Sequence, residues 1–203
     1  SKLTGNLKVP GDKSISHRSL IIGSLVNGRI EVNNLLESED VIATANALRI
    51  LGVRINKLND KWEVFGSGIG NFYGSNYVLN MGNSGTGARL LMGLVAGSDV
   101  EATFVGDESL SKRPMKRITV PLNKIGARIK SQTNNLPINI KGNKIVLPIE
   151  YKSSVSSAQV KSSILLAGLS SLGNTTVIEP SLSRDHTERM LNFFGANIST
   201  EQL

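Results

Sequence analysis

Three stretches of the sequence repeat the same local pattern, and this repetition limits the folds open to the chain more than any other feature. The stretches are ALRILGVRI at 47–55, PLNKIGARI at 121–129 and MLNFFGANI at 190–198. Each combines the end of an amphipathic helix, a glycine that caps it and the β-branched start of a strand. Because a recurring pattern of this kind is typical of repeated structural units, we expect three copies of one unit.

An apolar helix and a strand are expected upstream of each capping glycine. The helices lie within 18–28, 88–97 and 161–173, and each one runs into a glycine and then a strand. Residues 61–68 and 136–143 add a closing strand to the first and second copies, and the third copy stops before one. The sequence therefore predicts an α/β fold of three βαβαββ units around a pseudo-threefold axis, with the third unit incomplete. The capping glycines are Gly52, Gly126 and Gly195.

A polar or glycine-rich loop opens the first helix of each unit, and the three loops are GDKSISHR, GNSGTGAR and SSVSSAQVK. Backbone N–H groups and the dipole at a helix N-terminus favour an anion. Ser14 or Ser16 can cap the first of these helices. Three N-termini that face one side would form a triple anion site. The cations expected near their first turns are Arg18, Arg89 and Lys161.

The first loop does not match the phosphate-binding loop of nucleotide-binding proteins. That motif needs G-x-x-x-x-G-K-[ST] with uninterrupted N–H groups between its glycines. Here Gly5 lies too far from Gly11, Asp12 precedes the lysine, and Pro10 removes one donor. The helix start therefore favours an anion, but the spacing excludes a nucleotide-binding loop.

The formal charge of +7 suits either nucleic acid or small anionic substrates. Only 4% of the residues are aromatic, which is too few for the stacking surfaces that bind single strands. With no cysteine and two histidines, the sequence predicts no disulfide, no thiolate metal site and no self-contained histidine metal site. We also expect no cofactor. No apolar stretch is long enough to span a membrane, and the first residues do not resemble a signal peptide. We expect a cytoplasmic monomer that binds neither nucleic acid nor membranes.

Four motifs stand in one order along the chain: PGDKSISHR, GNSGTGARLL, SLSKRPM and SSAQVKSSILLAGL. Together they resemble the EPSP (5-enolpyruvylshikimate-3-phosphate) synthase family, and the resemblance runs across essentially the whole chain. The related UDP-N-acetylglucosamine enolpyruvyl transferases carry K-N-A where this chain has Lys13, Ser14 and Ile15, and they usually have a loop cysteine. We therefore favour the shikimate enzymes over this second family.

The resemblance implies two domains, each made of three βαβαββ units. Residues 13–203 would form nearly all of the first domain, with units at 13–78, 79–147 and 148–203. Residues 1–12 would be a strand that normally belongs to the second domain, whose remainder lies outside this chain. The main acid–base carboxylates are implied in that second domain, so the chain alone is expected to be inactive. The missing half, if made as a separate chain, is an expected partner.

The implied reaction transfers the enolpyruvyl group of phosphoenolpyruvate to the 5-hydroxyl of shikimate 3-phosphate and releases phosphate, in aromatic amino-acid biosynthesis. Lys13 matches a catalytic lysine that lies between the two substrates. The implied ligands of shikimate 3-phosphate are Lys13, Ser14, Arg18, Ser157, Ala158, Gln159, Ser183 and Arg184. Those of phosphoenolpyruvate are Lys13, Asn83, Gly85, Thr86, Arg113 and Gln159.

Some of these residues have alternative roles. Arg18 could instead form a salt bridge to Asp40 or Glu37, and Ser157 could serve only as a helix cap. Arg89 lies inside its helix, which favours a structural role over a ligand role.

Gly85 and Ala158 carry particular expectations. Without a Cβ, Gly85 lets the backbone approach a small ligand, and the resemblance implies that glyphosate competes with phosphoenolpyruvate there. Ala158 offers only its backbone N–H where many relatives have serine.

Two other functions stay open from the residues alone. One is a non-catalytic domain that binds a small anion or a sugar phosphate. The other is a basic nucleic-acid binder of similar fold, like the RNA 3′-phosphate cyclases, which the few aromatic residues disfavour.

Overall fold

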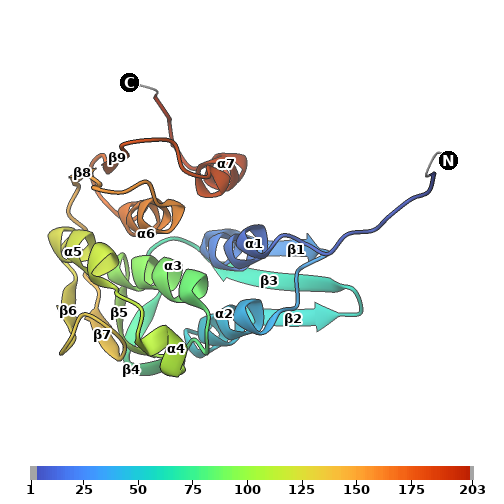
Figure 1. Cartoon of the computed structure of the whole chain (residues 1–203), viewed down its shortest axis with the longest axis horizontal. Coiled ribbons are helices and arrows are strands. Elements are labelled where there is room, and N and C mark those ends of the chain that lie inside the picture. Colours follow the sequence, from blue (N-terminus) through green and yellow to red (C-terminus); the bar gives the residue numbers. More distant parts are fainter. Residues whose placement is uncertain (1–3, 202–203) are drawn as a thin grey trace.

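The computed structural model describes residues 4–201 and shows three small sheets with helices packed among them (Figure 1). The first unit contains α1 (Lys13–Leu25), β1 (Asn27–Asn33), α2 (Glu39–Ile50), β2 (Arg54–Leu58) and β3 (Lys61–Ser67). The second contains β4 (Tyr73–Asn80), α3 (Gly85–Ala96), β5 (Asp99–Val105), α4 (Glu108–Ser111), α5 (Lys116–Lys124), β6 (Arg128–Lys130) and β7 (Ile138–Lys141). The third contains β8 (Glu150–Lys152), α6 (Ala158–Gly168), β9 (Thr176–Ile178) and α7 (His186–Phe193).

The strand order recurs from unit to unit. In the first sheet the order is β1-β3-β2, and both pairs are antiparallel. In the second sheet, β5-β7-β6 repeats that arrangement, and β4 lies parallel to β5. In the third sheet, β8 lies parallel to β9 as β4 does to β5. The α/β fold expected from the sequence is confirmed, and the pseudo-threefold arrangement of the units stays a prediction.

The sheets also bear on the limits of the units. The boundary expected at about residue 78 lies inside β4, which pairs with β5 of the second sheet, and the limits of the units stay predictions. Within the described part of the chain, residues 4–12 form no helix or strand, and the N-terminal part of this segment runs away from the body of the protein (Figure 1). Residues 1–3 lie outside the described residues. The strand expected over 1–12 therefore stays a prediction.

The three capping glycines adopt the backbone conformation that the repeat requires. Their φ angles are +94° at Gly52, +110° at Gly126 and +85° at Gly195, which is the left-handed region. A side chain with a Cβ is strained there, whereas glycine is not. The expected helix ends are confirmed, since Gly52, Gly126 and Gly195 follow α2, α5 and α7.

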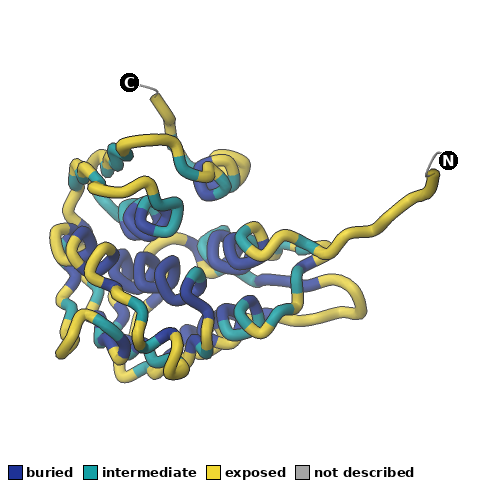
Figure 2. Tube along the Cα trace, viewed as in Figure 1, coloured by how far each residue is buried: buried dark blue, intermediate teal, exposed yellow. Residues whose placement is uncertain are grey.

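Helix α3 lies at the centre of the molecule, where Figure 2 shows a buried band of helices. Every residue of α3 except Thr86 is buried, and the helix packs against α1, α2, α5 and α6. Its contact with α6 is backbone to backbone. A Cβ added to Gly93 would overlap the carbonyl of Ser163 and lie 2.8 Å from its Cα. Glycine at this position therefore sets how closely α3 and α6 approach.

Two features are absent from residues 4–201. None of their helices combines the length and the apolar character needed to cross a membrane. Nor do these residues bring together three His, Asp or Glu side chains that could hold a metal ion.

Candidate functional site

Helix α1 begins with a carboxylate cap. Asp12 has an extended backbone and its side chain accepts a 2.8 Å hydrogen bond from the N–H of Ile15. The expected caps, Ser14 and Ser16, are wrong because both residues lie within the helix. The Ser14 hydroxyl instead accepts a 3.5 Å hydrogen bond from Arg184, so two of the expected shikimate 3-phosphate ligands are neighbours.

Arg18 is buried, with 3% of its surface exposed, and joins three helices. Its Nε donates to Thr187 of α7 at 2.6 Å, and its Nη2 donates to Ser162 of α6 at 2.8 Å. Its Nη1 donates to the Ser14 carbonyl at 3.1 Å. The alternative salt bridge to Asp40 or Glu37 is wrong, since Asp40 pairs with Lys13 at 2.7 Å. Burial lowers the pKa of Arg18, and the nearby Glu188 opposes that shift.

Four of the expected phosphoenolpyruvate ligands meet at the start of α3. Arg113 donates to the side-chain oxygen of Asn83, and Gln159 of α6 donates to the Thr86 hydroxyl at 2.9 Å. Asn83 in turn donates to Asp107 at 2.8 Å. These contacts place the first turn of α6 against the first turn of α3.

Arg89 was expected to have a structural role, and it holds Gln159 in place by a 2.7 Å hydrogen bond. Burial, together with Arg117 and Arg113, lowers the pKa of Arg89 to about 10. Three guanidinium groups therefore lie near one another. Because like charges repel in such a setting, a bound anion would relieve that repulsion.

Gly85 makes room for these arginines. A Cβ at this position would lie 2.9 Å from Nη1 of Arg113 and 3.2 Å from Nη1 of Arg89. The absent side chain thus admits two guanidinium groups at the helix start, which adds a reason for glycine beyond the expected approach of a ligand. The expected competition by glyphosate stays a prediction.

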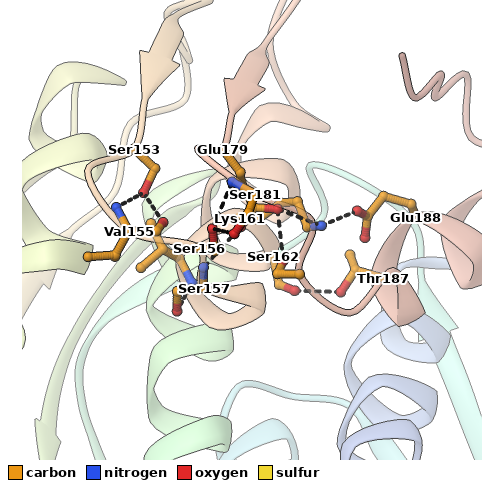
Figure 3. A network of polar contacts seen from close by, with 12 residues as sticks. Ser153, Val155, Ser156, Ser157, Lys161, Ser162, Glu179, Ser181, Thr187 and Glu188 are labelled. Atoms are coloured by element: carbon orange, nitrogen blue, oxygen red, sulfur yellow. Dashed lines mark hydrogen bonds and ion pairs between the residues drawn. The ribbon is translucent and has the colours of Figure 1, made fainter. Parts of the chain in front are cut away.

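A third group surrounds the start of α6, shown in Figure 3. Ser157 caps α6 through its hydroxyl, and its backbone N–H donates to Glu179 at 2.9 Å. Ser183 donates its hydroxyl to the same carboxylate at 2.8 Å. Lys161 lies in the first turn of α6 as expected, but its charge is shared with two carboxylates, since it pairs with Glu179 at 2.9 Å and with Glu188 at 2.6 Å.

The remaining expected ligands lie at helix ends. Lys13 is the first residue of α1, and 51% of its side chain is exposed beside Asp40. Ala158 is the first residue of α6, where a backbone N–H has no partner within its own helix. The expected ligands thus gather around the first turns of α1, α3 and α6, as the triple anion site requires. Their binding roles stay predictions.

A groove between α1, β1 and α7 lies apart from this cluster. Its lining includes His186, Met190 and Phe193, and none of the expected ligands contributes to it.

His17 is buried beside the candidate site and has no assigned role there. Its Nδ1 lies 2.9 Å from the Thr44 hydroxyl, and its Nε2 has no hydrogen-bond partner among residues 4–201. Burial lowers the pKa of His17 to about 4, although Asp40 opposes the shift. The folded protein therefore holds this imidazole neutral at neutral pH.

His17 is expected to make the free energy of unfolding decrease as the pH is lowered. Its folded pKa lies below the unfolded value, so its stabilising effect is complete above pH 6.5 and is lost progressively toward pH 4. The loss between pH 7 and pH 5 should be about 2 kcal/mol. In urea unfolding, the free energy of unfolding of His17→Asn should decrease less between pH 7 and pH 5 than that of the unchanged chain, and the difference should equal that loss. His186→Asn should behave as the unchanged chain does. Equal slopes in all three proteins would contradict this assignment.

Comparisons with known proteins complete the description. A family model described as EPSP synthase (3-phosphoshikimate 1-carboxyvinyltransferase) matches residues 1–203. The 3-phosphoshikimate 1-carboxyvinyltransferase of Bartonella quintana is 52% identical over 197 residues, which are 97% of this chain and 45% of that protein. The Zymomonas mobilis protein of the same name is 53% identical over 203 residues, with 98% and 45% covered.

A solved structure gives the same picture. The EPSP synthase of Acinetobacter baumannii superimposes with a TM-score of 0.91 at 44% identity, covering 97% of this chain and 45% of that one. The chain therefore spans about 45% of the length of the relatives it matches.

Proposed function

This chain belongs to the EPSP synthase family, and from that premise we propose that it supplies the first-domain half of the site where an enolpyruvyl group is transferred from phosphoenolpyruvate to shikimate 3-phosphate. The observation that carries the proposal is that side-chain hydrogen bonds join the N-terminal turns of α1 and α3 to α6, where the guanidinium groups of Arg18 and Arg89 are buried. Such a place favours small anions, because N–H donors and fixed cations face the same ligand. Both proposed substrates carry a carboxylate and a phosphate.

Shikimate 3-phosphate is proposed to lie across α1 and α6. Arg18, whose guanidinium is fixed by Thr187 and Ser162, would bind the planar carboxylate. Ser157 and the segment Ser183–Arg184 would bind the phosphate. Fixed donors of this kind position the 5-hydroxyl without further ordering of side chains.

Phosphoenolpyruvate is proposed to lie at the start of α3. Arg113 and the Asn83–Thr86 loop would bind its anionic groups, with Gln159 between the two substrates. Lys13 would neutralise charge that develops on both substrates in the transition state. In the reaction, the 5-hydroxyl oxygen loses its proton and adds to C2 of phosphoenolpyruvate while C3 gains a proton. C3 then gives up a proton as the C2–O bond to phosphate breaks, the double bond re-forms and phosphate leaves.

The organisation of the longer protein follows as part of the proposal. Residues 13–203 form most of a first domain, and residues 1–12 join a second domain that carries the acid–base carboxylates. We also propose that the protein is a cytoplasmic monomer, as expected from the sequence.

Binding of shikimate 3-phosphate to the ¹⁵N-labelled 203-residue chain tests the proposal. The titration should move the amide resonances of Ser14, Arg18, Ser157 and Gln159, and an equal concentration of inorganic phosphate should leave Arg18 unmoved. Arg18→Ala should cost about 1.5–3 kcal/mol of binding free energy, the usual worth of a hydrogen bond to a charged group.

A matched control keeps this result specific. Arg29→Ala removes an arginine whose side chain is 60% exposed and pairs with Glu63, and it should bind shikimate 3-phosphate as the unchanged chain does. Melting temperatures of both variants separate loss of binding from loss of fold. If Arg18→Ala binds as tightly as Arg29→Ala, Arg18 does not hold the carboxylate.

A further inference from the structure

Glu179 sits at the centre of the polar network in Figure 3. One carboxylate oxygen accepts the backbone N–H of Ser157 at 2.9 Å. The other accepts the hydroxyl of Ser183 at 2.8 Å and lies 2.9 Å from Nζ of Lys161. The side chain is 10% exposed, so this carboxylate is almost fully enclosed by groups that stabilise its charge.

Lys161 forms an ion pair with Glu179. Its side chain is 11% exposed and lies between Glu179 and Glu188, with the second contact at 2.6 Å. Burial alone would raise the pKa of Glu179, but hydrogen bonds from Lys161 and Ser183 bring it below its usual value. Glu179 is therefore ionised at neutral pH. Because Lys161 is shared with Glu188, it offsets only part of the repulsion that Glu179 would exert on a phosphate.

The network joins two segments that are far apart in sequence. Ser157 lies before α6, and Ser183 lies in the segment between β9 and α7. A second tie reinforces the first, since the hydroxyls of Ser156 and Ser181 lie 2.7 Å apart and the Ser181 N–H donates to Ser156 at 3.0 Å. The two segments are thus held at a fixed separation.

The hydrogen bonds also decide which donors stay available. The backbone N–H of Ser157 is used by Glu179, and the Ser157 hydroxyl oxygen caps α6, which leaves the hydroxyl proton free. The single proton of the Ser183 hydroxyl is used by Glu179. A phosphate between the segments would therefore meet the Ser157 hydroxyl and the neighbouring Arg184.

We infer, on the basis of the proposed function, that Glu179 is a positioning residue for the phosphate of shikimate 3-phosphate. Held by Lys161, it fixes the segment before α6 against the segment after β9, so that the Ser157 hydroxyl and Arg184 face one phosphate. Glu179 itself does not touch the ligand.

Two substitutions at this position separate positioning from charge. Glu179→Ala removes both acceptors, whereas Glu179→Gln keeps an acceptor for the Ser157 N–H and removes the charge. Glu108→Ala is the control, because Glu108 is exposed and pairs only with Lys112 one turn away. Each 203-residue variant is titrated with shikimate 3-phosphate and with shikimate, which lacks the phosphate.

Glu179→Ala should weaken binding of shikimate 3-phosphate about tenfold or more, the effect of misplaced binding groups. Its affinity for shikimate should be unchanged, a selectivity that simple loss of stability would not produce. Glu179→Gln should lose less, and Glu108→Ala should lose nothing.

Two outcomes have different meanings. If the unchanged chain binds shikimate 3-phosphate and Glu179→Ala binds it equally or more tightly, the positioning role is overturned while the proposed function stands. If the unchanged chain shows no binding at all, the proposed function fails.

Discussion

The 203-residue chain, supplied with shikimate 3-phosphate and phosphoenolpyruvate, is expected to release no measurable phosphate. The reaction needs a base for the 5-hydroxyl and an acid for the methylene carbon, and each such group typically contributes about 10²–10⁴-fold. Carboxylates beside the candidate site are already engaged: Asp12 caps α1, Asp40 pairs with Lys13, and Glu179 pairs with Lys161. Without two positioned groups, the rate should fall at least about 10⁴-fold below that of a complete enzyme.

A phosphate-release assay checks this, with the complete EPSP synthase of Acinetobacter baumannii as the reference under the same conditions. The binding titration described above confirms that the chain is folded and occupied by substrate. Turnover within a hundredfold of the reference would show that the chain holds a full catalytic set. Recovery of activity when the remaining half of the protein is added would support the two-domain proposal.

Gly93→Ala is expected to lower the stability of the chain more than most single substitutions do. Its Cβ would overlap the backbone of Ser163, which no side-chain rotation can relieve. Overpacking that forces backbone shifts typically costs about 1–3 kcal/mol and occasionally more, and we expect the upper end here because the clash is with backbone atoms. For a chain of this size, the melting temperature should drop by about 6–12 °C.

The same substitution should also weaken the candidate site. Pushing α6 from α3 would lengthen the hydrogen bonds of Gln159 to Thr86 and Arg89, so shikimate 3-phosphate should bind less tightly. Gly5→Ala is the matched control, since a Cβ there would meet nothing within 4 Å. A melting temperature for Gly93→Ala within a degree of that control would mean that the two helices can separate freely.

Features that depend on a few neighbouring residues could be predicted from the sequence. The helix ends at Gly52, Gly126 and Gly195 were predictable because a left-handed residue after a helix demands glycine. The family resemblance likewise rests on short motifs. Even local signals compete, however: Asp12 rather than Ser14 or Ser16 caps α1, because a carboxylate one residue earlier already accepts the free N–H of Ile15.

Features set by contacts between distant residues could not be predicted. Lys161, Glu179 and Glu188 have no spacing that marks them as partners, because they lie in three separate parts of the fold: α6, the residue after β9, and α7. A cation at the first turn of a helix therefore suggested an anion ligand from outside the chain. The sequence also could not show that β4 belongs to the second sheet, because the sequence of a strand does not reveal which strand it pairs with.

The contact between Arg18 and Thr187 has a consequence for how the chain is made. These residues are 169 positions apart, so α1 leaves the ribosome long before its partner on α7 exists. At about 5–20 residues per second, the interval is roughly 10–30 s. During that time the guanidinium of Arg18 must stay hydrated, because an unpaired buried charge is costly. Helix α1 is thus among the last of the described helices to complete its contacts, and nascent chains halted before residue 187 should leave its inner face open to proteases and chaperones.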